Sequence, residues 1–178
     1  MGKLLLFASL LIVRSAHAED PDKAFQDFAR REATEDKRYV AEWYTANLDA
    51  DAALERVAVL CTPADASDPK GFFLIEKDAT HRWELTFDVD SHTRACKGKP
   101  AAEPAFEQRK TKVIELYQAH LQGFESTSFA LRVGQPVIVR EEESSGDGKK
   151  PVVKDWDELM KKKKAKSYQS PERLRPLN

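Results

Sequence analysis

The stretch YVAEWYTANLDADAALERVAVLC, residues 39–61, carries the clearest structural signal in the chain. Residues 39–46 and 55–61 are rich in aromatic and β-branched side chains, which favour extended backbone. The polar residues 47–54 lie between them and are typical of a loop. The stretch therefore predicts two adjacent strands joined by that loop.

The same pattern of short apolar runs continues towards the C-terminus. Four further strands are expected at residues 71–77, 82–89, 128–133 and 136–142. Residues 112–121 fit a helical stripe as well as a strand, but Gly123 and the residues after it favour a hairpin, so we expect a strand. Short strands at regular spacing predict a mainly β, β-dominated α+β fold, built as an antiparallel meander, a sandwich or an open barrel with an N-terminal helix.

The chain before and after this β-rich region has a different character. Residues 19–38 form an expected helical segment, because Pro21 suits a first turn and apolar residues recur at helical spacing. A single β-rich domain is expected over residues 39–166, with an irregular surface loop at 97–104. Residues 167–178 are polar and contain two prolines, which predicts a loose C-terminal tail.

Residues 1–18 have the layout of a secretory signal peptide. Lys3 is followed by the apolar residues 4–13 and by a small-x-small site that ends at Ala18. An apolar helix of this length spans ~15 Å, about half of a ~30 Å hydrocarbon core, which argues against the alternative of a membrane anchor. We therefore expect cleavage after Ala18, export to the periplasm or the extracellular space, and no transmembrane segment in the mature chain.

Two cysteines, Cys61 and Cys96, lie in the part of the chain expected to be exported. An even number of cysteines in an oxidising compartment predicts one disulfide. The alternative is a redox or metal-binding pair, but the spacing is far from C-x-x-C.

The charge balance argues against general nucleic-acid binding. The chain has 29 basic and 30 acidic residues, and without Lys3 and Arg14 of the signal peptide 27 basic residues remain against the same 30 acidic ones. Nucleic-acid binding needs a net basic surface to neutralise phosphates. No nucleic-acid partner is expected.

The loop at residues 47–55 contains the most specific chemical motif. Oxygen-bearing side chains recur at alternate positions and then after a gap, at Asn47, Asp49, Asp51 and Glu55. This alternation lets a tight loop turn several oxygens onto a hard cation such as calcium. Residues 43–60 resemble the calcium loops of the FG-GAP and VCBS-type repeats of exported proteins. The resemblance implies these four residues as ligands of a weakly bound Ca²⁺.

Two positions of the loop depart from that family pattern. Ala52 stands where the repeats have glycine, and Asn47 replaces the first acid. The alternative is a solvated turn that keeps the shape of the loop without an ion. The chain contains no second copy, so a propeller built of such repeats is excluded.

The remaining candidates each have a plain structural alternative. Asp88, Asp90 and His92 alternate on a strand and fit a second metal site, or a polar strand end. Tryptophans at three positions fit a sugar-binding platform if exposed, but tryptophan in a strand is typical of a core: Trp43, Trp83 and Trp156. The lysine run at residues 161–164, with Lys166, fits an anion-binding patch or a solvated surface.

No catalytic motif is recognisable in the sequence. Three histidines remain after signal cleavage, His81, His92 and His120, and neither G-x-S-x-G nor H-E-x-x-H is present. We expect a non-enzymatic binding or structural protein of the cell envelope or periplasm, whose partner is a protein or a polysaccharide. The alternatives are an exported hydrolase, which a cleft with a histidine and carboxylates would favour, and a secreted enzyme inhibitor, which a protruding loop would favour.

Overall fold

A computed structural model describes residues 20–49, 51–89, 96 and 106–177. The expected signal peptide, the loop at 97–104 and the residues Asp90 and His92 lie outside the described residues.

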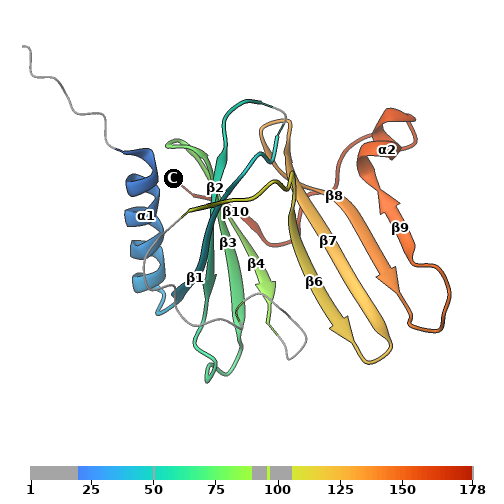
Figure 1. The fold of residues 1–178 in the computed structure, drawn as a ribbon, viewed down its shortest axis with the longest axis horizontal. Helices are drawn as coiled ribbons and strands as arrows, with labels where there is room; N and C mark the ends of the chain where they lie inside the picture. The colour runs from blue at the N-terminus through green and yellow to red at the C-terminus, as the bar shows by residue number, and fades with distance from the viewer. Residues whose placement is uncertain (1–19, 50, 90–95, 97–105, 178) are drawn as a thin grey trace, which may run out of the picture.

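The described chain folds into two antiparallel β-sheets and two helices (Figure 1). The first sheet has six strands in the order β10-β4-β3-β2-β1-β5, in which only the short β5 runs parallel to its neighbour, and the second has four in the order β6-β7-β8-β9. The elements are α1 (Pro21–Glu35), β1 (Tyr39–Ala46), β2 (Glu55–Cys61), β3 (Lys70–Asp78), β4 (His81–Asp88), β5 (Glu107–Gln108), β6 (Ile114–His120), β7 (Gly123–Arg132), β8 (Gln135–Ser144), β9 (Val152–Asp155), α2 (Trp156–Lys161) and β10 (Leu174–Leu177). The β-dominated α+β fold is confirmed, and the sheets are open rather than closed into a barrel.

Helix α1 covers the outer face of the first sheet (Figure 1). Asp20 caps its N-terminus by accepting a hydrogen bond from the Asp22 N–H at 3.0 Å, and Pro21 occupies the first turn. The helix ends at Glu35, three residues before the expected end at 38, because Lys37 adopts a left-handed φ of 54°. Its apolar stripe packs on side chains of three strands, namely Trp43, Ala58, Leu60, Phe72 and Leu74.

The main core lies on the opposite face of the first sheet, between the two sheets. Alternate residues of a strand point to opposite faces, so Val57 and Val59 face this core while Ala58 and Leu60 face α1. Strand β2 is therefore buried on both faces, which explains its nearly continuous apolar sequence. The second sheet contributes Ile114, Phe129, Leu131 and Ile138 to the core.

The expected disulfide is present. Cys61 at the end of β2 is bonded to Cys96, with their Cα atoms 5.6 Å apart. The ambiguous segment at 112–121 contains strand β6, paired with β7 through the turn before Gly123, so the expected strand is confirmed. No helix in the described part of the chain has the length and apolar character needed to cross a bilayer.

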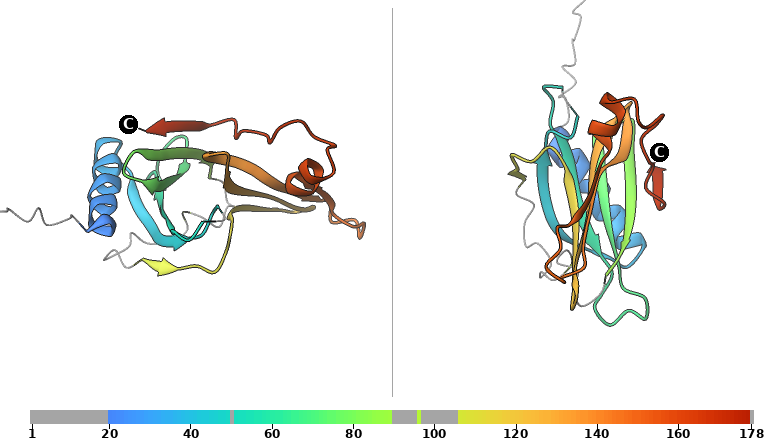
Figure 2. Two further views of the ribbon diagram at one scale, coloured as in Figure 1. Left: turned by 90° about the horizontal axis from the view of Figure 1, so that it is seen from above. Right: turned by 90° about the vertical axis from the view of Figure 1, so that its right-hand side faces the viewer.

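The C-terminal segment differs from the expected loose tail. Residues 168–177, which we call the strap, run from the second sheet to the first (Figure 2). The Ile138 N–H donates to the Gln169 carbonyl at 2.9 Å, and the Thr86 N–H donates to the Arg173 carbonyl at 3.1 Å. The final residues then pair with β4 as strand β10. The polar composition and the two prolines of this segment did not predict the ordered strap, because its hydrogen-bond partners are distant in sequence.

Candidate functional site

The loop between β1 and β2 lies where the two sheets meet. The strands pair as expected, with Ala46 opposite Glu55 at the loop end of the ladder. Leu48 is buried in the core, and its carbonyl accepts hydrogen bonds from the Leu131 N–H at 2.9 Å and from the Arg132 guanidinium at 3.3 Å. These bonds join the loop of the first sheet to the end of β7 in the second.

Three of the four expected ligands converge in this loop. Carboxylate oxygens of Asp49, Asp51 and Glu55 all lie within 4.8 Å of one another. Asp49 accepts from the Asp51 N–H and Asp51 accepts from the Ala53 N–H, both at 2.8 Å, so each aspartate also shapes the turn. The fourth, Asn47, donates its amide N–H to the Asp51 carbonyl at 2.5 Å and thereby holds the loop.

Glu55 is the unusual member of this cluster because its side chain is fully buried. One carboxylate oxygen accepts from the Leu48 N–H at 2.5 Å, whereas the other, Oε1, has no hydrogen-bond partner among the described residues. Burial raises the pKa of Glu55, and the nearby charges of Asp49 and Asp51 raise it further. An orphaned buried carboxylate oxygen beside two more carboxylates fits a hard, oxygen-seeking cation.

A lysine from the neighbouring strand already lies on this cluster. The Lys77 ammonium, at the end of β3, is 2.5 Å from Asp49 Oδ2 and 3.3 Å from Asp51 Oδ2. Burial raises the pKa of Asp49, but the hydrogen bonds from Lys77 and Asp51 outweigh burial and the net shift is downward. The same contacts raise the pKa of Lys77. The sequence did not indicate Lys77, since only the strand register brings it to the loop.

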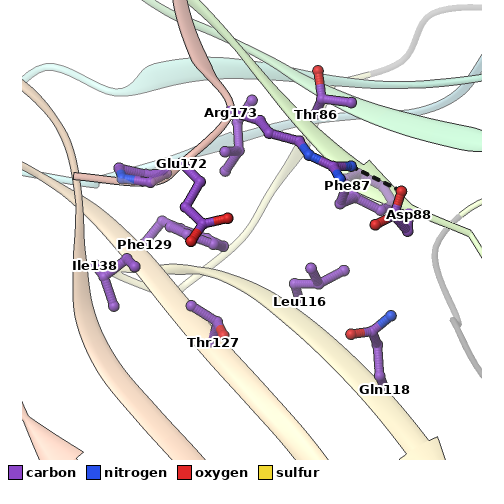
Figure 3. A pocket seen from close by; sticks show the side chains of 12 residues that line it. Thr86, Phe87, Asp88, Leu116, Gln118, Thr127, Phe129, Ile138, Glu172 and Arg173 are labelled. Atoms are coloured by element: carbon purple, nitrogen blue, oxygen red, sulfur yellow. Dashed lines mark hydrogen bonds and ion pairs between the residues drawn. The ribbon is translucent and has the colours of Figure 1, made fainter. Parts of the chain in front are cut away.

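A cleft opens between the two sheets beside the strap (Figure 3). Its volume is about 260 Å³, and its apolar lining comes from both sheets: Leu85, Phe87, Leu116, Phe129 and Ile138. Charged side chains form the rim, where Arg173 of the strap is paired with Asp88 of β4 at 2.8 Å. The cleft therefore presents an apolar floor below a polar rim.

An acidic hollow of about 370 Å³ lies next to the cleft and shares Thr127 with it. Glu125 of β7 stands directly opposite Glu143 of β8, and Thr127 stands opposite Glu141. Glu141 has partners, namely the Trp156 indole N–H at 3.1 Å and the Lys154 ammonium at 3.7 Å. Glu125 and Glu143 make no ion pair with any residue that the structure describes.

We call the cleft and the acidic hollow together the trough. Its residues lie on β4 of the first sheet, on all four strands of the second sheet and on the strap. The alignment of these elements could not be read from the sequence. The run of three glutamates at 141–143 in β8 was visible, but not the position of Glu143 opposite Glu125.

The structure places the remaining candidates apart from one another. Trp43 and Trp83 are buried on opposite faces of the first sheet, so they belong to the core and form no sugar-binding platform. His81 lies at the β3–β4 turn, where its Nδ1 is 2.9 Å from Asp78. His120 lines an adjoining hollow of about 220 Å³, which shares Glu125 and Glu143 with the acidic hollow.

The basic run begins on helix α2 and is partly neutralised. Lys161 and Lys162 pair with Glu158 at 3.3 and 3.2 Å, while the following lysines are exposed. This arrangement agrees with a solvated surface.

No protein-family model, curated protein or solved structure matches this chain. The resemblance of residues 43–60 to FG-GAP and VCBS-type loops stays a prediction.

Proposed function

We propose that the protein is an exported, non-enzymatic binding protein of the cell envelope or periplasm, and that its trough binds an extended, basic segment of a partner protein. The disulfide between Cys61 and Cys96 supports the exported location, because such bonds persist in oxidising compartments.

The pair of Glu125 and Glu143 makes no ion pair with any described residue and lies beside an apolar cleft, and this single observation carries the proposed binding role. Like charges directly opposite each other on neighbouring strands destabilise a sheet. A lysine or arginine from a partner would relieve this repulsion, and an apolar side chain of the same segment would fill the cleft. Combined apolar and charge complementarity is typical of protein recognition.

The positions of the tryptophans favour a protein over a polysaccharide as the partner. A sugar-binding surface usually offers an exposed aromatic ring for stacking. Trp43 and Trp83 are buried, and the indole N–H of the half-buried Trp156 is bonded to Glu141.

An exported hydrolase is the second candidate, because His120 shares a hollow with Glu125 and Glu143. His120 is the last residue of β6, whereas Glu125 and Glu143 lie within β7 and β8. Histidine and carboxylate side chains are the usual general acids and bases of hydrolases.

The test is selection from a library of random extended peptides against the purified protein. We expect enriched peptides to combine an apolar residue with lysine or arginine, and to bind more weakly as salt concentration rises. Peptides enriched in acidic residues, or no enrichment, would refute the proposal.

The variant Glu125→Lys separates binding from folding. It converts the Glu125–Glu143 repulsion into an attraction, so the fold should become slightly more stable while peptide binding is lost. Glu35→Lys makes the same change of charge at the exposed end of α1 and should leave binding intact.

A further inference from the structure

We infer that Lys77 is the resident cation of the β1–β2 loop and competes with a divalent cation for the carboxylates of Asp49 and Asp51. This inference goes beyond the proposed function and is independent of the trough.

The ammonium group of Lys77 lies where a bound cation would have to lie. It lies between two of the three converging carboxylates, 2.5 Å from Asp49 and 3.3 Å from Asp51. A cation bound by these oxygens at about 2.3 to 2.6 Å would occupy the volume in which the ammonium now lies. Lysine and metal therefore exclude each other.

Lys77 leaves one carboxylate of the cluster, that of Glu55, without a positively charged partner in the described part of the chain. Glu55 Oε1 is buried and has no hydrogen-bond partner among the described residues, and one oxygen of the same carboxylate belongs to the converging group. A lysine neutralises one charge of three carboxylates, whereas a divalent cation neutralises two. Once the Lys77 ammonium is removed, the three carboxylates should therefore bind a divalent ion.

The Lys77 side chain can move into solvent when a metal ion binds. Its side chain is 31% exposed and Asp49 is 15% exposed, so the ammonium can swing into water on its flexible stem while the carboxylates stay in place. To bind, a metal ion must break the two partly exposed ion pairs of Lys77. Pairs of this kind are weak, so their loss should lower the metal affinity of the wild-type protein about tenfold relative to a protein without Lys77.

The test is a calcium titration of metal-free protein by isothermal calorimetry, with melting temperature as a second readout. Lys77→Met should bind calcium about tenfold more tightly than the wild-type protein and gain a larger rise in melting temperature. Lys77→Arg keeps the positive charge and should stay near wild type. Adding Glu55→Gln to Lys77→Met should abolish the gain.

Lys70 provides a matched control on the same strand. Its ammonium also pairs with two carboxylates, those of Asp68 and Asp88, but among the described residues no buried third carboxylate accompanies them. Lys70→Met should therefore leave calcium affinity unchanged.

Three outcomes would overturn the inference. They are equal calcium affinity of Lys77→Met and wild type, absence of binding in both, and an equal gain in Lys70→Met. Circular dichroism of each variant verifies the fold, and Lys77→Gln replaces Lys77→Met if the methionine variant fails to fold.

Discussion

Replacing Glu55 with glutamine should stabilise the protein when no cation is present. Glu55 is fully buried, its Oε1 has no hydrogen-bond partner among the described residues, and its carboxylate lies close to those of Asp49 and Asp51. In Glu55→Gln the amide oxygen can still accept from the Leu48 N–H, and the amide N–H₂ can donate to the aspartates. Leaving a buried polar group unsatisfied costs about 1 to 3 kcal/mol, so the variant should gain a free energy of unfolding in that range at pH 7.

The gain in stability should depend on pH in a defined direction. The folded-state pKa of Glu55 is raised above the ordinary 4.5. Below 4.5 the carboxyl is protonated in both the folded and the unfolded chain, so it carries no penalty. As the pH rises from 4.5 through the folded-state pKa, the unfolded chain loses its proton first and wild-type stability falls. The difference between variant and wild type should therefore be small at pH 4 and grow towards pH 7.

Urea unfolding in buffer with a chelator, at several pH values between 4 and 7, measures this difference. Glu107→Gln is the control, because Glu107 is exposed on β5 and its replacement should change stability by less than about 0.5 kcal/mol. A Glu55→Gln protein that is less stable than wild type at pH 7, or a gain that does not vary with pH, would refute the reasoning.

Three further changes test the scaffold by urea unfolding. Replacing Cys61 and Cys96 with serine should cost about 4 kcal/mol, since the bond closes a loop with a sequence separation of 35, and a loss below about 1 kcal/mol would contradict this. Gly71→Ala should cost about 1 to 3 kcal/mol, because the new Cβ would lie 2.1 Å from the Phe87 ring, and unchanged stability would show that the ring moves freely. Tyr168→Phe removes the 2.7 Å hydrogen bond that fixes the strap to α2 and should cost about 1 kcal/mol, whereas an unchanged midpoint would indicate that the strap is held elsewhere.

The sequence was most informative where the structure is local or strongly periodic. The composition of residues 39–61 predicted both strands and the loop between them, because strand and turn preferences depend on residues close together in sequence. The position of α1 followed from Pro21, although its end did not. The disulfide followed from an even cysteine count.

Features that depend on distant partners were not predicted. Strand β10 is short and contains Pro176, and it is a strand only because β4 provides its hydrogen bonds. Lys77 and the Glu125–Glu143 pair both depend on strand register, which composition does not reveal. Helix α2 could have been found, since Asp155 accepts from the Glu158 N–H at 2.9 Å and the D-x-x-E pattern of a helix cap is present in the sequence.

The most direct test of the proposed function is the footprint of a bound basic peptide on the ¹⁵N-labelled protein, measured by amide chemical shifts. Our account predicts that the largest shifts lie in β6, β7 and β8, at Leu116, Glu125, Thr127 and Glu143, and that they disappear in Glu125→Lys. Shifts concentrated on α1 or at the Asp49 loop, with the trough unchanged, would contradict it.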